Sequence, residues 1–349
     1  QDCDWLVVWP NSGTTALNAT DVTVNVDETT LTPGSHVCNM IITGADALNG
    51  PQTIQVTLYV GRNLKVPSEF PTIQQAIDSA NPYDSVVIAD GVYQGAGNDE
   101  ISFRGKSITV RSENGPENCT VGSKQQESLC AFFFDNDEGK NSILEGLTIL
   151  AGDIAVRCDR SAPTIQDCIL SGYGGLYAQW SDGITIDNCI VRNCDGGIGA
   201  AGSFATISKC VIQNNNQGLG FFSCPEIRIE DSIISGNGDR RRPSGGVSSI
   251  DTGLEMNNCT VVGNGASVKW GGGLFGHSYR TEVSNCIFWN NRPNQIDPLF
   301  EHHGIRYCNV QYGYQGDGNM DADPCFIDPG YWDPNGTPED ANDDFWIDG

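Results

Sequence analysis

A short phrase recurs six times in the second half of this 349-residue chain. Each copy contains alternating apolar residues, then Asp, Asn or Lys, then Cys or Ser, and finally more apolar residues and Gly or Asn. The copies follow one another at steps of 21, 21, 22, 27 and 27 residues, and their Cys or Ser positions are Cys168, Cys189, Cys210, Ser232, Cys259 and Cys286. A repeat of this length, built from short β-rich phrases, is typical of a β-solenoid.

Two positions of the phrase predict corners. The residue before the Cys or Ser is Asp, Asn or Lys, and the residue four after it is Gly or Asn. Gly and Asn tolerate left-handed backbone, so each rung is expected to turn at both positions. Lys209 is the one lysine at the first position. It is interpreted either as a catalytic base or, preferably, as one partner of an ion pair stacked with Asp231 above it.

The repeated cysteines are interpreted as a column of buried free thiols, because free Cys behaves as a small apolar residue. Disulfides between neighbouring rungs stay open as an alternative, since adjacent strands lie within bridging distance. The cysteines outside this column are the better candidates for disulfides: Cys3, Cys38, Cys119 and Cys130.

Residues 1–61 differ from the rest and predict a small antiparallel β-sandwich. Apolar residues alternate in 22–26 and 54–60, with turn residues between them. The segment resembles the BACON-like immunoglobulin-type modules of bacterial secreted proteins through Trp5-Leu6, Pro10–Gly13, the strand ending at Asp27, Leu31–Gly34 and the strand closing at Val60. The resemblance implies either glycan binding or a spacer role, and the spacer is favoured because no sugar site is evident.

Residues 62–330 are predicted to form the solenoid itself. Its start carries a short amphipathic helix at about 72–80, where Thr72 and Gln75 form a capping box. This opening, the strands in 84–93 and 101–111, and the repeats behind them resemble the right-handed parallel β-helix family related to pectate lyases. The resemblance implies an all-β fold: a right-handed parallel β-helix preceded by a small antiparallel β-sandwich. It does not imply one activity, because the superfamily includes lyases, hydrolases, esterases, adhesins and inert surface proteins.

Charge and composition restrict the partners. A formal net charge of -25 argues against nucleic acid, whose phosphates require clustered Lys and Arg. It also disfavours a polyanionic glycan unless calcium bridges the two. No apolar run approaches the roughly 18 residues of a membrane span. The acidity and the cysteine content favour a secreted protein, extracellular or at the cell surface.

The sequence assigns no catalytic residue. A lyase needs a base, and a hydrolase needs paired carboxylates, but Asp182, Asp187 and Asp231 are expected on different faces. The other candidates share one long rung: Lys269, His277, Tyr279 and Arg280. Several aromatic residues could stack on a sugar, but their offsets within the repeat differ, so core or loop packing is favoured for Tyr177, Trp180, Phe221, Phe222 and Trp270. The three arginines at 240–242 are interpreted equally as an anion clamp or a solvated turn.

Calcium is the predicted cofactor. Oxygen-bearing residues alternate in one segment and continue into the acidic tail, 331–349, as they do in calcium loops. The candidate ligands are Asp317, Asn319, Asp321, Asp323, Asp333, Asn335, Glu339 and Asp344. Pro338 stands where such a loop expects glycine, and acidic turns also occur without metal.

The last residues, Phe345, Trp346 and Ile347, are interpreted as the start of an unfinished strand. Such an edge would pair with another copy head to tail, forming a ring or a filament; a truncated chain end is the alternative. The sequence therefore predicts a secreted structural or adhesive β-helix protein that self-assembles. The alternatives are a glycan-active enzyme, foremost a calcium-dependent polysaccharide lyase, and a glycan-binding protein without catalysis. Whether the protein is an enzyme stays open, with the balance against it.

Overall fold

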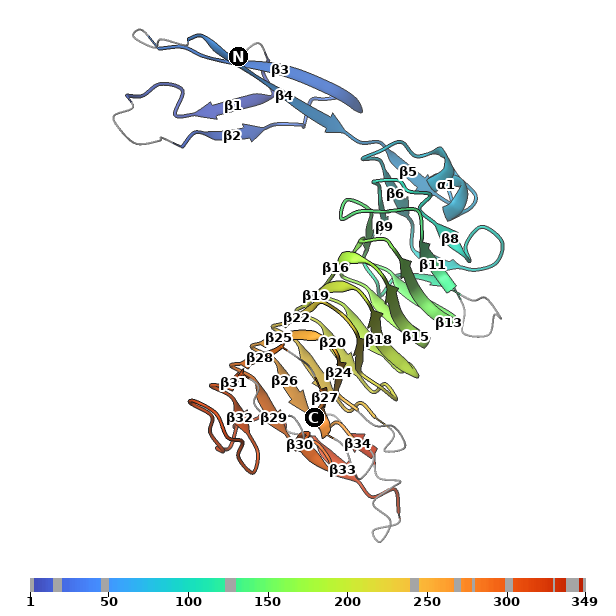
Figure 1. The fold of residues 1–349 in the computed structure, drawn as a ribbon. Coiled ribbons are helices and arrows are strands. Elements are labelled where there is room, and N and C mark those ends of the chain that lie inside the picture. Colours follow the sequence, from blue (N-terminus) through green and yellow to red (C-terminus); the bar gives the residue numbers. More distant parts are fainter. Residues whose placement is uncertain are drawn as a thin grey trace.

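Parallel strands stack on one another to form a right-handed β-helix in the computed structural model of this chain (Figure 1). The structure describes residues 3–14, 21–44, 50–122, 130–238, 245–266, 271–277, 280–298, 304–328, 330–336 and 345–347. None of the helices in these segments is long and apolar enough to cross a bilayer.

The N-terminal part consists of two antiparallel strand pairs beyond the end of the β-helix (Figure 1). One pair joins β1 (Leu6–Trp9) to β2 (Thr23–Val26), and the other joins β3 (Gly34–Ile42) to β4 (Gln52–Val60). Its core is small, comprising Trp5, Leu6 and Cys38, and Cys38 forms a disulfide with Cys3. The antiparallel architecture is confirmed, while the resemblance to BACON-like modules stays a prediction.

Each rung of the β-helix contributes strands to three parallel faces. The first face is an eleven-stranded sheet made of β5 (Asn63–Val66), β6 (Ser85–Ile88), β9 (Thr109–Ser112), β12 (Ile143–Glu145), β14 (Thr164–Gln166), β16 (Asp182–Asp187), β19 (Phe204–Ser208), β22 (Glu226–Glu230), β25 (Gly253–Asn257), β28 (Arg280–Ser284) and β31 (Gly304–Arg306).

The second and third faces share one seventeen-stranded sheet, because the long strands β13 (Thr148–Asp159) and β15 (Ile169–Gln179) run through both. The second face also contains β7 (Gly91–Tyr93), β10 (Cys119–Gly122), β17 (Ile190–Arg192), β20 (Val211–Gln213), β23 (Ile233–Ser235), β26 (Thr260–Val262), β29 (Ile287–Trp289) and β32 (Asn309–Val310). The third face also contains β8 (Ile101–Ser102), β11 (Cys130–Phe134), β18 (Gly196–Ala201), β21 (Leu219–Phe222), β24 (Val247–Ile250), β27 (Gly271–His277) and β30 (Asn294–Ile296).

The helix α1 (Ile73–Ser79) packs at the N-terminal end of this stack. Thr72 is its N-cap, and the Thr72 side chain accepts a hydrogen bond from the Gln75 backbone N–H. Ile73, Ala76 and Ile77 are buried in the same core as the strands. The helix therefore covers apolar side chains that a stack of strands would otherwise leave exposed.

The predicted corners are present. Every residue before the Cys or Ser column has left-handed φ angles between 51° and 56°: Asp167, Asn188, Lys209, Asp231, Asn258 and Asn285. At the second corner, Asn193, Asn214, Gly236, Gly263 and Asn290 are also left-handed. Gly172 differs, because β15 continues through it from the second face to the third without a break.

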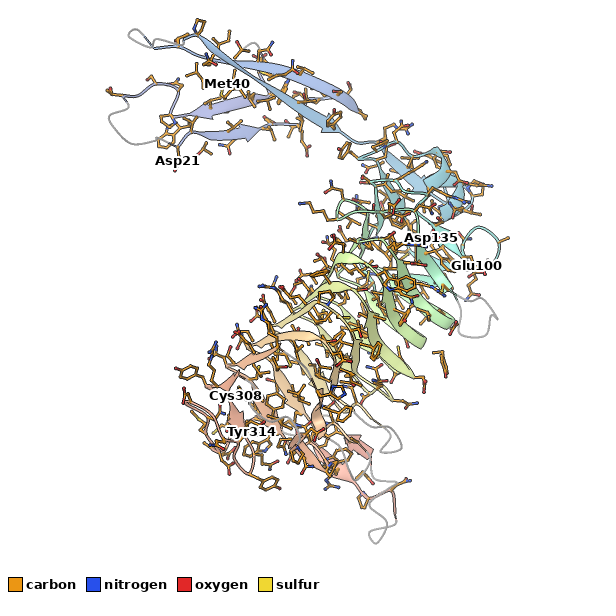
Figure 2. The ribbon with its side chains drawn as sticks, in the orientation of Figure 1. Asp21, Met40, Glu100, Asp135, Cys308 and Tyr314 are labelled. Carbon is orange, nitrogen blue, oxygen red and sulfur yellow. A yellow bond between two sulfur atoms is a disulfide. The ribbon has the colours of Figure 1, made fainter. Side chains whose placement is uncertain are left out.

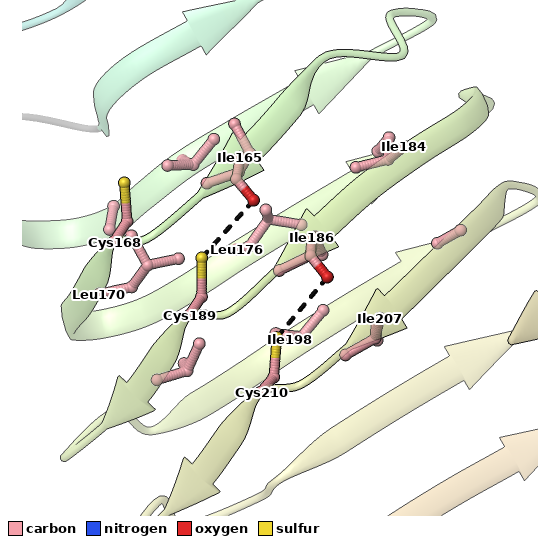
Figure 3. Close-up of a cluster of buried hydrophobic side chains, with 14 of the residues drawn as sticks. Ile165, Cys168, Leu170, Leu176, Ile184, Ile186, Cys189, Ile198, Ile207 and Cys210 are labelled. Atoms are coloured by element: carbon pink, nitrogen blue, oxygen red, sulfur yellow. Dashed lines mark hydrogen bonds between the residues drawn. The ribbon is translucent and has the colours of Figure 1, made fainter. Parts of the chain in front are cut away.

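The cysteine column is a row of buried free thiols, as expected (Figure 3). The Cys189 thiol donates to the Ile165 carbonyl at 3.5 Å, and the Cys210 thiol donates to the Ile186 carbonyl at 3.6 Å. Such contacts satisfy a weak donor inside an apolar core. The disulfide expectation is wrong for Cys119 and Cys130, which are also buried free thiols.

A column of asparagines, here called the asparagine ladder, directly follows the second corner in the sequence of each rung that it includes. It comprises the buried residues Asn215, Asn237, Asn264 and Asn291. The amide of Asn264 donates to the Ile234 carbonyl at 2.8 Å, and its oxygen accepts from the Asn237 backbone N–H at 3.0 Å. The ladder thereby pairs corner groups that the sheets leave unpaired.

Candidate functional site

A groove lies on the third face of the β-helix, where four successive rungs meet. Along this face, Tyr177, Gly199, Gly220 and Ser248 stand in register on four successive rungs. The two glycines carry no side chain, so the surface is hollow between Tyr177 and the rungs beyond. The groove has a volume of about 530 Å³.

Aromatic rings lean over glycines at this site. A Cβ atom placed on Gly199 would stand 3.2 Å from Tyr177 Cδ2, so the phenol ring lies against the bare backbone of the next rung. One on Gly202 would stand 2.8 Å from Trp180 Cδ1. Trp180 is 60% exposed and lies at the corner beside the groove. A side chain at either position would therefore push against the ring on the preceding rung, more closely at Gly202 than at Gly199.

Two half-buried carboxylates lie along one rim. Tyr173 and Asp195 precede the paired residues Gly174 and Gly196, and Asp153 precedes Ile154 on the rung before, where the register between β13 and β15 shifts. The rungs of Asp153 and Asp195 are two strand spacings apart, about 10 Å between their backbones. The Asp195 carboxylate accepts a hydrogen bond from Asn216 Nδ2 at 2.9 Å. Gln217, on the next rung, reaches over Gly220, where a Cβ atom would stand 2.8 Å from Gln217 Nε2.

The far side of the groove is apolar and is formed by Phe222 and Ile250. Phe222 is 56% exposed. Beyond Ile250, the exposed Asp251 and His277 face each other, with 3.4 Å between Asp251 Oδ1 and His277 Nδ1. Among the described residues that line the groove there is no Lys, Arg or His. The arrangement offers aromatic faces, carboxylate acceptors and one amide to a ligand.

The aromatic candidates from the sequence have different fates. Tyr177 and Phe222 line the groove, so the expectation of core or loop packing is wrong for them. It is right for Phe221, which is buried in the core. Trp180 is exposed at the corner, and Trp270 lies outside the described residues. The opposite orientation of Phe221 and Phe222 follows from the alternation of side chains along β21.

The charged candidates do not gather at the groove. Lys209 pairs with Asp187 at 3.4 Å, not with the predicted Asp231, because Asp187 extends from the adjacent rung of the first face. Asp231 accepts from Asn258 Nδ2 at 2.6 Å, and Arg280 pairs with Glu255 at 2.9 Å. Asp182 lies at the start of β16. The candidates Lys269 and Tyr279 and the arginines at 240–242 lie outside the described residues.

The first predicted calcium segment forms a further corner. Asn319 occupies the place of the cysteine column on the next rung, because its oxygen accepts from the Cys308 backbone N–H at 2.9 Å. Its amide donates to the Ile305 carbonyl at 3.0 Å. Tyr314 packs beside it on the end of the core, and Figure 2 shows Tyr314 near Cys308 at this end.

The remaining candidate ligands are exposed or outside the described residues. Asp317, Asp321 and Asp323 are exposed. The carboxylate of Asp333 accepts from the Asn335 backbone N–H at 2.8 Å, which is a local turn. Glu339 and Asp344 lie outside the described residues. No group of three or more His, Cys, Asp or Glu side chains in the described segments could hold a metal. Calcium binding stays a prediction.

The C-terminal phrase folds back onto its own chain. Strand β34 (Phe345–Ile347) pairs antiparallel with β33 (Tyr331–Asp333), and the Trp346 side chain is only 7% exposed. Its indole covers the corner glycines Gly236 and Gly263. The expectation that this phrase is an unpaired edge with an aromatic anchor free for another copy is therefore corrected. Head-to-tail assembly itself stays a prediction.

The sequence of the β-helix matches a known family. A model described as the right handed beta helix region matches residues 100–252 and 152–307, which together span more than half of the chain. The chain belongs to this family. No curated protein matches its sequence.

Several solved structures are similar to this chain, two of them with TM-scores above 0.5. The family member described here is similar to pectate lyase Pel9A at a TM-score of 0.53 and 12% identity, over 77% of this chain and 83% of that one. It is similar to ORF18 of Geobacillus virus E2 at 0.57 and 14%, over 74% and 59%. A polygalacturonase from Erwinia carotovora ssp. carotovora aligns at 0.38 and 16%, over 73% and 81%. At these identities the likeness shows the fold alone.

The sequence did contain a signal for the groove. Pairs of glycines begin the third-face strands, as in 174–175 and 196–197, and a further glycine two residues on, Gly199, points outward. The alternation that places Leu176 and Ile198 in the core places Tyr177 and Gly199 on the surface. The rungs differ in length, so the sequence alone does not give the pairing between them. It therefore could not show that Tyr177 lies beside Gly199.

Proposed function

We propose that this protein binds a polysaccharide chain in the groove of the third face. The observation that carries the proposal is the ring of Tyr177 lying against Gly199, with the exposed ring of Phe222 on the other side of the glycine floor. Sugar rings present C–H faces that pack on aromatic rings. A concave, mostly apolar site with a few polar groups is the usual form of a ligand site.

The polar rim supplies the hydrogen bonds that a sugar needs. Neighbouring hydroxyl groups of a sugar donate in pairs, and the carboxylates of Asp153 and Asp195 accept at two oxygens each. Their separation of about 10 Å along the β-helix axis is close to the length of two linked pyranose rings. A glycan running along the axis would therefore meet one carboxylate at each end of a disaccharide. The pectate lyase of similar fold is named for a polysaccharide substrate, which accords with this ligand class.

Affinity gel electrophoresis across a panel of soluble polysaccharides, followed by calorimetry on any that retard the protein, tests this proposal. The variants Tyr177→Ala and Phe222→Ala should each weaken binding at least tenfold, which corresponds to about 1.4 kcal/mol. Tyr331→Ala, which removes an exposed ring outside the groove, is the matched control. Equal affinity in all three variants, or no retardation by any glycan, would contradict groove binding.

A second candidate function is cleavage of the bound chain. Asp153 and Asp195, the two carboxylates in the described lining, are the groups that such a reaction would use as acid and base. Release of reducing ends without an unsaturated product, lost in both Asp153→Asn and Asp195→Asn, would establish hydrolysis. Binding without new reducing ends would leave a binding protein. A product absorbing near 235 nm would instead indicate a lyase, which cleaves the chain by base-catalysed elimination.

The N-terminal strand pairs are proposed to act as a spacer in a secreted protein. The Cys3–Cys38 disulfide supports an oxidising, extracellular location, because such bonds persist there and are rare in the cytosol. Deleting residues 1–61 should then leave glycan affinity unchanged in electrophoresis. A loss of affinity in the truncated protein, with its β-sheet circular dichroism retained, would place a sugar site in the N-terminal part.

A further inference from the structure

We infer that the groove selects uncharged glycans and rejects polyuronates, although the fold is shared with a pectate lyase. The inference rests on the proposed glycan binding and adds the substrate class. It is carried by the sign of the charges in the groove. The acidic side chains in the described lining are Asp153 and Asp195, and the described lining has no Lys, Arg or His beside them.

A uronate carboxylate entering this groove would face repulsion without compensation from the described lining. Recognition of a carboxylate normally uses Arg or Lys, with Arg giving two parallel hydrogen bonds. The described lining contains neither. Like charges at close range raise the free energy of the complex, and the net charge of -25 adds to the long-range repulsion.

Two described cations adjoin lining residues without lining the groove themselves. Arg157 pairs with Tyr177 from the preceding rung, on the opposite side of the phenol ring from Gly199. His277 is beyond Ile250 and faces Asp251. Neither side chain lines the groove.

Uncharged sugars fit the same groups. Their hydroxyl groups donate hydrogen bonds, and carboxylates are the strongest acceptors available in a protein. Gln217 adds an amide that both donates and accepts. The rings of Tyr177 and Phe222 provide apolar contact that requires no charge. The site therefore favours a chain of neutral hexoses or hexose derivatives.

Two pairs of polysaccharides that differ in charge but share a backbone test the inference. One pair is highly methyl-esterified homogalacturonan and polygalacturonate; the other is hydroxyethylcellulose and carboxymethylcellulose. In each pair that binds, we expect the uncharged member to bind at least tenfold more tightly than its carboxylated partner, with and without calcium. Equal or tighter binding of a carboxylated member, in either condition, overturns the inference while leaving glycan binding intact.

Absence of binding to either pair and to the wider panel of neutral glycans would overturn the proposed function and this inference together. Failure of the charge selection can be distinguished from failure of glycan binding. If polyuronate binds and Tyr177→Ala weakens this binding, the groove is a glycan site and only its charge selection is refuted.

A double variant checks the cause. Asp153→Asn/Asp195→Asn should raise the affinity for the carboxylated member by about tenfold, because the side-chain shape is retained and the repulsion is removed. The control Asp317→Asn/Asp321→Asn removes the same charge at an exposed corner far along the chain and should leave the ratio unchanged. If both doubles act alike, net charge and not the groove sets the selection, which overturns the inference. Polyuronate binding that disappears when 240–242 are changed to Gln would also overturn it.

Discussion

The phenol ring of Tyr177 lies against Gly199 of the following rung, with Tyr177 Cδ2 3.2 Å from the place that a Cβ atom on Gly199 would occupy. The two residues are partners in the ladder between β15 and β18. The contact is therefore fixed by strand register and by the absence of a side chain, not by a flexible loop. The contact holds the Tyr177 ring in place as one wall of the groove, and the glycine backbone beside it forms the floor.

Gly199→Val should weaken glycan binding at least tenfold, because the added methyl groups displace the Tyr177 ring and fill the floor. The φ angle of Gly199 is not left-handed, so the substitution strains no backbone and the fold should persist. Calorimetry with the tightest-binding polysaccharide measures the effect. Gly139→Val is the control, since a Cβ there meets nothing within 4 Å. If Gly199→Val keeps the wild-type affinity, the glycan does not bind over Gly199.

The asparagine ladder leads to a prediction about stability. Asn264→Ala should lower the free energy of unfolding by about 2–4 kcal/mol, because it leaves the Asn237 backbone N–H and the Ile234 carbonyl buried without this partner. Chemical denaturation gives the value. Asn118→Ala, at an exposed site, should cost no more than about 0.5 kcal/mol. Similar costs in the two variants would show that the ladder adds nothing specific.

The corners could be predicted from the sequence because their cause is local. A left-handed residue is needed at each one, and Asp167, Asn188 and Gly236 are residue types that accept this conformation. The asparagine ladder had a comparable signal, since Asn215, Asn237, Asn264 and Asn291 each stand five residues after the cysteine column.

The groove and the C-terminal packing could not be predicted in the same way. The groove depends on four rungs of unequal length, because Tyr177, Gly199, Gly220 and Ser248 are 22, 21 and 28 residues apart along the chain. The packing of Trp346 depends on Gly263, a corner residue far away in sequence whose lack of a side chain leaves room for the indole. The acidic segment at 317–323 resembled a calcium loop because tight corners and calcium loops both use Asp, Asn and Gly.

Buried thiols should make the protein less stable at alkaline pH. Burial raises the pKa of Cys119 to about 12 and that of Cys130 to about 11, from an ordinary value of 9.0. Above pH 9 the unfolded chain loses these protons while the folded chain keeps them, so folding stability is complete below pH 9 and falls toward pH 12. Urea unfolding at pH 8, 9 and 10 measures the decline. Cys119→Val should decline less steeply, and an identical slope would rule out this thiol as a contributor.

Native-state thiol labelling should find a single reactive cysteine. Cys325 is the exposed free thiol, whereas the other free cysteines are buried. A thiolate reagent at neutral pH should therefore modify Cys325 at once and the others only after unfolding. Mass spectrometry of the labelled peptides identifies the sites. Rapid modification of the column cysteines, such as Cys189 or Cys210, would mean that the β-helix opens readily in solution.

Trp346→Ala separates intramolecular packing from self-assembly. Trp346 packs edge-on against Trp332 at 5.6 Å, and Trp332 donates to the Asn290 carbonyl at 2.8 Å. Losing the buried indole should cost the C-terminal strand pair about 3–5 kcal/mol of local stability. Limited proteolysis should then cut the tail at least tenfold faster, while thermal unfolding of the β-helix stays unchanged. Tyr331→Ala, which removes an exposed ring from the same strand pair, is the control.

Sedimentation velocity provides the second measurement. We expect the same mass for wild type and Trp346→Ala, because the indole packs on a corner of its own chain. An assembly that is present in wild type and lost in the variant would show that Trp346 contacts a neighbouring copy instead.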